Sequence, residues 1–376
     1  MANAQLEWDQ EELLAGHDVA EPLVAGGVRC HGGFDSDGAY ISPRTLNRAP
    51  AIAAWQAQRG EQFHTPLLDI ELSAWPESYP NVAQAKFLIS AGVPEPVISS
   101  LTRIGTVEGF GAAIRHSTIP DFGACLVEDT RGTAMAHLGR GLFEAHARDE
   151  AGFDDEGGHK QMWFAARDVA FENPVTEDQT QFMLQRMGLA TPPGTPEPDP
   201  AEARRQMEAR RLVPDVDADL EFLIARMAGL LLIEISAFHT FSWAEQVLSD
   251  TDLVAGEGEA ARLVSYIRSD ETPHVEYLKT VLSELADRTF VDTDGAHRPG
   301  RDVVGPLWDR ARSESLGIRR LATMKLSLSE VARALEPHRA GADLLEEFHS
   351  LGSIRPGPDG DWVSVAPIPN PDGHEG

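Results

Sequence analysis

The sequence predicts an all-α protein: a helical bundle with additional helices, an irregular N-terminal arm and an extended C-terminal tail. From about Asn81 onward, apolar residues recur at the three- and four-residue spacing of amphipathic helices. Residues 1–80 and the segment from Ser353 are instead rich in Gly, Pro and Asp, which favour turns. We therefore expect the helical segment to form the body of the protein and both ends to be irregular.

The composition of the 376-residue chain excludes several classes of protein. Hydrophobic residues make up 42% and charged residues 24%, as in a soluble globular protein with a sizeable core. The formal charge of −28 repels phosphate backbones, so no nucleic-acid partner is expected. Cys30 and Cys125 are too few for a four-cysteine zinc site or an iron–sulfur cluster. No GxGxxG motif opens a helix, so a nucleotide-binding fold has no support.

Two features predict a cytoplasmic protein without a membrane partner. The N-terminal sequence MANAQLEWDQEELLAGHDVAEPL is acidic and lacks the apolar segment of a signal peptide. The longest apolar stretch, AGLLLI at residues 228–233, is far too short to span a bilayer.

The chain divides into three regions. Residues 1–80 form an irregular arm or cap, in which the turn-rich piece 26–45 has at most a short strand or hairpin. Residues 81–290 form the bundle, which is interrupted by a Pro-rich linker near 190–202. Residues 291–376 form a C-terminal helical extension and tail. The main helices expected are 216–248, 258–287 and a pair within 305–350.

The segment SYIRSDETPHVEYLKTVL contains the clearest candidate for a metal site. On a helix, Glu271 and His274 point at one spot because they are three residues apart. A lone ionised carboxylate on a buried face would cost several kcal/mol, and a metal ion supplies its counter-charge. The alternative is that both residues lie at the edge of the apolar face of this helix, in water. The apolar residues on the same face are Val264, Ile267, Leu278 and Leu282.

A second candidate is Glu234, in the middle of the preceding long helix. Apolar residues occupy its face for two turns on either side, and the alternative partner is an arginine across the bundle. If the two long helices run antiparallel, Glu234 and Glu271 lie at the same height. The apolar residues of this face are Leu223, Met227, Leu230, Leu231, Phe238 and Phe241.

The first half of the bundle should supply matching ligands. Glu108 lies in the centre of another apolar stripe, whereas Glu128 is interpreted as a capping or solvent residue. The stripe around Glu108 contains Val97, Leu101, Ile104, Gly105 and Ala112.

The partner helix in this half carries His146 and Glu150 on one broad face, with Glu144 opposite. The segment RDEAG is similar to SDETP in the later helix, and this similarity aligns Glu150 with Glu271. FDDEGG then interrupts the helix before His159. We prefer Glu150 over Glu156 as the carboxylate beside His159, because the paired glycines after Glu156 are poor helix formers. This prediction requires a break in the helix, since nine residues of regular helix span roughly 13 Å.

Taken together, these residues resemble the ligand set of the ferritin-like dimetal carboxylate superfamily. The resemblance covers about residues 95–290 and implies a ferritin-like bundle with two iron ions. Members such as ribonucleotide reductase small subunits, bacterial multicomponent monooxygenases and arylamine N-oxygenases reduce O₂ at such a site. His146 looks like the third histidine of the N-oxygenase branch, and the FDDEGG stretch departs from the family pattern. The candidate ligands are Glu108, His146, Glu150 or Glu156, His159, Glu234, Glu271 and His274.

The resemblance implies an O₂-activating dinuclear iron oxidase or oxygenase that acts on a small organic substrate. We also expect an external electron donor, and a homodimer is compatible with such a protein. Mixed carboxylate and imidazole ligation suits manganese as well as iron, so a dimanganese catalase-like enzyme is one alternative. A non-catalytic metal-binding or storage bundle is another, although the long arm and C-terminal extension argue against storage.

Two further groups of residues have weaker interpretations. His31, beside Cys30, could bind a metal ion but is interpreted as a loop residue. Several helical aromatic residues could line a substrate pocket, although aromatic residues at such spacing more often belong to the core. These residues are Trp163, Phe164, Phe238, Phe241 and Trp243.

Overall fold

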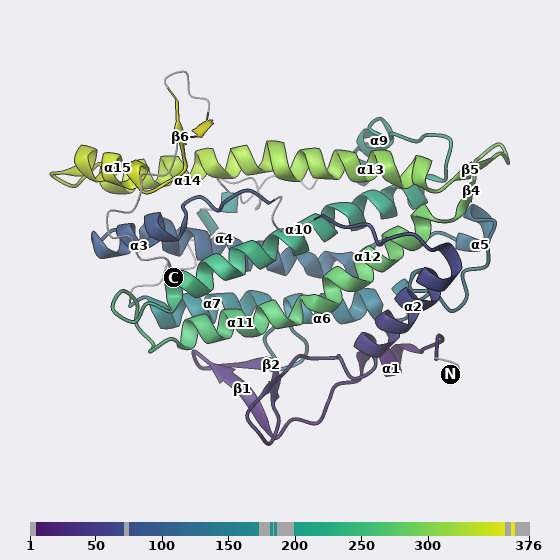
Figure 1. Ribbon diagram of the computed structural model, residues 1–376, viewed down its shortest axis with the longest axis horizontal. Helices are drawn as coiled ribbons and strands as arrows, with labels where there is room; N and C mark the ends of the chain where they lie inside the picture. The colour runs from purple at the N-terminus through teal and green to yellow at the C-terminus, as the bar shows by residue number, and fades with distance from the viewer. Residues whose placement is uncertain are drawn as a thin grey trace.

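The computed structural model describes residues 5–70, 75–172, 181–182, 184–185, 199–357 and 362–364. Helices make up 61% of it, which confirms the prediction of a mostly helical protein. Three layers are visible in Figure 1: helices α13 to α15 along one side, the bundle in the middle, and the strands of the N-terminal arm on the other side. Among the described residues, no helix combines the length and apolarity needed to cross a bilayer.

The central bundle carries all the candidate ligands. Helix α7 packs against both α4 and α11, while α10 packs against α11 and α12. The 31-residue helix α10 begins at a cap in which Asp217 accepts a hydrogen bond from the Leu220 amide. The bundle helices are α4 (Glu95–Gly111), α6 (Phe143–Ala151), α7 (His159–Ala170), α10 (Ala218–Leu248), α11 (Glu259–Asp270) and α12 (Thr272–Ala286).

The long helix expected over 258–287 is divided in two at Glu271. Helix α11 ends at Asp270 and α12 begins at Thr272, although the Val275 amide still donates to the Glu271 carbonyl at 3.1 Å. Pro273 accounts for the break, because proline has no backbone N–H to donate to the preceding turn.

The predicted break between Glu150 and His159 is present. Helix α6 ends at Ala151, residues 152–158 form a tight loop, and α7 begins at His159. The loop starts at Gly152, whose positive φ of 83° favours glycine. A π-helical turn, η4 (Leu138–Leu142), precedes α6 and leads its chain into the bundle.

The N-terminal arm is more regular than expected. Strands β1 (Glu21–Ala25), β2 (Val28–Phe34) and β3 (Tyr40–Ile41) form an antiparallel sheet instead of a single hairpin. Helix α2 (Arg48–Phe63) follows the sheet. Its sequence is rich in alanine, which favours a helix, and one face of this helix is buried. A shorter helix, α1 (Gln10–Leu14), precedes the sheet.

The C-terminal region is helical as predicted, and its helices cover Arg301 to Ser350. Most of the expected Pro-rich linker and most of the expected tail lie outside the described residues. The remaining helices are α3 (Val82–Ser90), η2 (Ala112–His116), α5 (Phe122–Cys125), η3 (Met135–His137), α9 (Pro200–Glu208), α13 (Arg301–Ser313), η5 (Glu314–Arg319), α14 (Arg320–Leu335) and α15 (Gly341–Ser350). The remaining strands are β4 (Thr289–Val291) paired with β5 (His297–Pro299), and β6 (Ile354–Pro356) paired with β7 (Trp362–Ser364).

The core of the bundle consists of two apolar clusters with a polar layer between them. Helix α10 contributes residues up to Ile235 to one cluster and residues from Ala237 onward to the other. On α11, residues up to Ile267 belong to the second cluster, and on α12, residues from Val275 onward belong to the first. The candidate ligands of these helices lie at this change of cluster, so they form a polar layer halfway along the bundle.

Candidate metal centre

The structure brings six of the seven predicted ligand residues into two adjacent groups. In each group, one ligand atom from every member lies within 4.8 Å of the others, and every member is buried. Both groups contain Glu150 and His274, so they share one side. The first group is His146, Glu150, Glu234 and His274, and the second is Glu150, His159, Glu271 and His274.

Glu150 lies at the centre of this arrangement. Its carboxylate oxygens lie 3.6 Å from His146 Nε2, 3.5 Å from His159 Nδ1 and 3.4 Å from His274 Nδ1. No other predicted ligand approaches all three imidazoles in this way among the contacts of the described residues. Glu150 would therefore be a ligand shared by both groups.

The two remaining glutamates each serve one side. Glu234 Oε1 lies 3.4 Å from His146 Nε2, while Glu271 approaches His159 Nδ1 at 2.8 Å and His274 Nδ1 at 2.6 Å. The antiparallel helices therefore bring Glu234 and Glu271 to the same layer, as the sequence predicted.

Glu108 lies at the edge of the layer. Its Oε2 atom is 4.0 Å from His159 Nδ1, and its side chain is 9% exposed, whereas that of Glu150 is 1% exposed. Glu108 belongs to neither of the two groups. Its nearest imidazole is that of His159, a member of the second group.

The rejected candidates point away from the layer. Glu156 is 34% exposed and lies 3.3 Å from Arg29, so Glu150 is the carboxylate beside His159. Glu144 accepts a hydrogen bond from Arg148 on the outer face of α6. Glu128 accepts a hydrogen bond from the amide of Thr289, the first residue of strand β4, and takes no part in the layer.

On the nitrogen that faces away from the glutamates, His274 and His146 each have a hydrogen-bonding partner, and His159 has an aspartate nearby. His274 Nε2 donates to Asp149 Oδ2 at 2.9 Å, and His159 Nε2 lies 3.6 Å from Asp270 Oδ2. His146 Nδ1 lies 3.1 Å from the Tyr277 hydroxyl. Such partners fix the ring orientation of metal-binding histidines.

The two orienting aspartates are arranged crosswise. Asp149 precedes Glu150 in the first half of the bundle but contacts His274 in the second half. Asp270 precedes Glu271 in the second half but contacts His159 in the first. The parallel between RDEAG and SDETP therefore has a structural meaning, since each Asp-Glu pair contacts both halves of the site.

Several polar atoms in the layer have no hydrogen-bond partner. They include His146 Nε2, both carboxylate oxygens of Glu150, both ring nitrogens of His159 and Glu271 Oε1. Buried polar atoms are nearly always satisfied, because a missing hydrogen bond costs about 1–3 kcal/mol. Lone pairs of imidazole nitrogens and carboxylate oxygens that point toward one another repel, and a cation bound between them would remove this repulsion. The donor set therefore fits a pair of divalent ions.

The charges of the layer support the same conclusion. The layer contains six carboxylates, four from glutamates and two from aspartates, and Arg44 and Arg48, which both pair with Asp149, supply two positive charges. With neutral histidines, four negative charges remain in a buried space, and two divalent ions would neutralise them. Such an excess is too costly to bury without cations or protons.

The pKa values of the metal-free site show where protons would go instead. Burial, followed by repulsion from neighbouring carboxylates, raises the pKa of Glu108 and of Glu234 well above the usual range. Burial alone would lower the pKa of His159 and of His274, but neighbouring Glu271 reverses this effect and raises both well above the usual range. Four groups therefore hold protons more tightly than usual when no metal is bound.

The N-terminal arm contributes residues that the sequence analysis missed. The loop interpretation of His31 is wrong: it lies on β2, is fully buried and is 3.1 Å from Asp270 Oδ2. Arg44 and Arg48 both pair with Asp149. No local sequence pattern predicts that an arginine is buried. The apolar spacing within α2, however, is typical of a helix beginning near Arg48.

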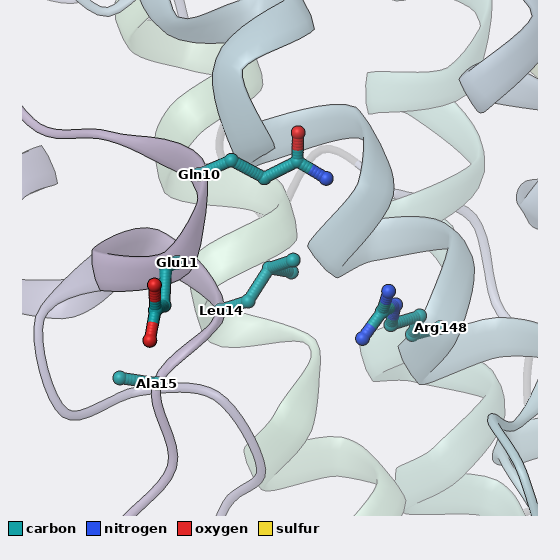
Figure 2. A pocket seen from close by; sticks show the side chains of 5 residues that line it. All are labelled: Gln10, Glu11, Leu14, Ala15 and Arg148. Atoms are coloured by element: carbon teal, nitrogen blue, oxygen red, sulfur yellow. The ribbon is translucent and has the colours of Figure 1, made fainter.

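The aromatic residues considered for a pocket belong mainly to the core. Trp163, Phe241 and Trp243 are members of one apolar cluster, and Phe238 packs against the other. A hollow of about 610 Å³ lies instead at the surface between α1 and α6. In Figure 2, the side chain of Arg148 faces α1 across this hollow, which contains none of the candidate ligands. It is lined by Gln10, Glu11, Leu14, Ala15 and Arg148.

Comparison of the chain with protein-family models, with curated proteins and with solved structures gives no match. The site must therefore be interpreted from its own geometry.

Proposed function

We propose that this protein is an O₂-activating dinuclear iron oxidase or oxygenase with a ferritin-like carboxylate site. One observation carries the proposal: three imidazoles and three carboxylates converge, with unpartnered atoms, in a buried layer between two apolar clusters. Carboxylate and imidazole ligands in this proportion suit iron. The substrate class we propose is a small organic molecule, with electrons from an external donor.

In this proposal the ligands divide between two ions. His146 and Glu234 would hold one ion, and His159 and Glu271 would hold the other, with Glu108 close to His159. Glu150 and His274 lie between the two groups. Two bound iron ions would supply electrons for the reduction of O₂.

The other residues of the site have defined tasks. Asp149 accepts a hydrogen bond from the outer nitrogen of His274, which would leave the lone pair of the inner nitrogen free for an ion, and Asp270 lies 3.6 Å from the outer nitrogen of His159. The apolar clusters above and below the layer exclude water, which strengthens the electrostatic interactions inside it.

Metal loading followed by O₂ exposure tests the proposal. The purified chain should bind about two iron ions after anaerobic addition of Fe(II), because two ligand groups are present. Exposure to O₂ should then consume O₂ and produce a transient visible absorption. A metal-free protein or a single zinc ion would contradict the dimetal proposal. Tight binding of two manganese ions with peroxide disproportionation would favour the dimanganese alternative, and slow iron accumulation without turnover would favour storage.

A glycine on α4 provides a separate prediction. A Cβ atom at Gly111 would lie 2.8 Å from Cγ of Glu150, so Gly111→Ala should displace that carboxylate. We expect the affinity for iron to fall by about tenfold or more. The matched control is Gly229→Ala on α10, where nothing lies within 4 Å of the added atom. Metal titration of both variants checks the prediction, and equal affinities would contradict it.

A further inference from the structure

Strand β2 of the arm lies against the loop between α6 and α7. The His31 amide donates to the Gly157 carbonyl at 2.9 Å, and the Gly157 amide donates to the Arg29 carbonyl at 2.8 Å. A Cβ atom at Gly157 would lie 3.0 Å from Val28 Cγ1, so a glycine permits this close approach. The loop that interrupts the first half of the site is therefore the surface on which the arm docks.

This docking inserts His31 behind the candidate metal centre. His31 is fully buried, and its Nε2 donates to Asp270 Oδ2 at 3.1 Å. On the other side of the ring, Arg44 donates to His31 Nδ1 at 3.2 Å. Arg44 also donates to Asp149 through Nε at 2.7 Å. Its backbone is held at a φ of 51°, a conformation that non-glycine residues rarely adopt.

These contacts form one continuous chain behind the two ligand groups. Asp149 holds His274, and Asp270 faces His159. Arg44 and His31 join the two aspartates. In order, the chain is His274, Asp149, Arg44, His31, Asp270 and His159. The two ligand imidazoles are thus connected through two residues of the N-terminal arm.

We propose that the arm and the loop 152–158 act together as a positioning clamp for the metal centre. Arg44 and His31 are positioning residues: they hold Asp149 and Asp270, each of which faces one imidazole of the site. The inference rests on the proposed metal centre. It assigns a role to two sequence features that the dimetal pattern leaves unexplained. These are residues 27–35 (GVRCHGGFD) in the turn-rich piece of the arm, and the FDDEGG loop.

The clamp makes arm docking and metal binding reciprocal. A bound ion that fixes His274 and His159 favours the docked arm, and a docked arm favours the ion by the same factor. Loss of an orienting partner of a metal-binding histidine typically weakens metal affinity 10- to 100-fold. The clamp therefore predicts losses of that size from Arg44 and His31, which belong to neither of the two ligand groups.

The test uses the full chain with Fe(II) alone as the probe, under anaerobic conditions and in competition with a chelator. Arg44→Lys keeps a positive charge but cannot contact Asp149 and His31 together, and His31→Leu removes both contacts of the ring. We expect about 10- to 100-fold weaker iron binding for each. His31→Gln retains a donor toward Asp270 and should recover part of the affinity. Val24→Ala is the control, since Val24 lies on the neighbouring strand β1 of the arm and is 59% exposed.

Hydrogen exchange at residues 28–34 provides the second measurement, because it reports the docked strand without any activity. Iron should slow exchange of the wild-type strand and have little effect on Arg44→Lys. Full iron affinity in both Arg44→Lys and His31→Leu would overturn the clamp and leave the metal centre intact. Failure of the wild type to bind iron would overturn both. Partial recovery in His31→Gln shows that the losses do not come from misfolding.

Discussion

Replacing Glu150 with alanine should remove both metal ions, whereas Glu156→Ala should leave the metal content unchanged. Glu150 belongs to both ligand groups and lies within 3.6 Å of all three imidazoles. Glu156 is partly exposed and pairs with Arg29 at the surface. Elemental analysis after iron supplementation gives the number of ions per chain for each variant.

The two variants control for each other, because they make the same change at the end of α6 and in the loop that follows it. Circular dichroism should show that both retain the helical fold, since two apolar clusters stabilise the bundle independently of the layer. His274→Ala and Glu234→Ala should likewise lose metal while the fold survives. Loss of metal only in Glu156→Ala would show that the ligand assignment is wrong.

Metal loading should release protons from the site. The metal-free site holds protons on groups whose pKa values are raised: His159, His274, Glu108 and Glu234. Divalent ions require these ligands without their protons. Iron affinity should therefore rise as pH increases through the raised pKa values and fall as pH decreases.

Calorimetry in buffers of different ionisation enthalpy measures the released protons directly. The Glu234→Gln variant should release fewer protons than the wild type, because an amide carries no acidic proton. Metal affinity that does not change between pH 6 and pH 8, together with no proton release, would contradict the ligand assignment.

The local part of the site could be predicted from the sequence. Glu234, Glu271 and His274 stand out because helical spacing alone places them within apolar stripes. Glu150 could be preferred over Glu156 because the glycines after Glu156 indicate a loop, and a loop is present there.

The non-local part could not be predicted. His31 reaches the layer through the pairing of β2 with a loop more than 100 residues later in the chain, and no spacing rule describes such a contact. Arg44 lies in a short turn whose backbone conformation has no sequence signal for arginine. Helix α2 is a different case. The spacing of Ala51, Ile52 and Trp55, which are buried on one face, is visible in the sequence and is typical of an amphipathic helix.

The polar layer between two apolar clusters has a consequence for the maturation of the protein. Since each end of the bundle has its own apolar core, we expect the scaffold to fold before any ion arrives. The ions must then enter a finished structure in which most ligands are sealed. Glu108 is the most solvent-accessible of the candidate ligands, and α4 is therefore the side from which a chaperone or a free ion would deliver the metal.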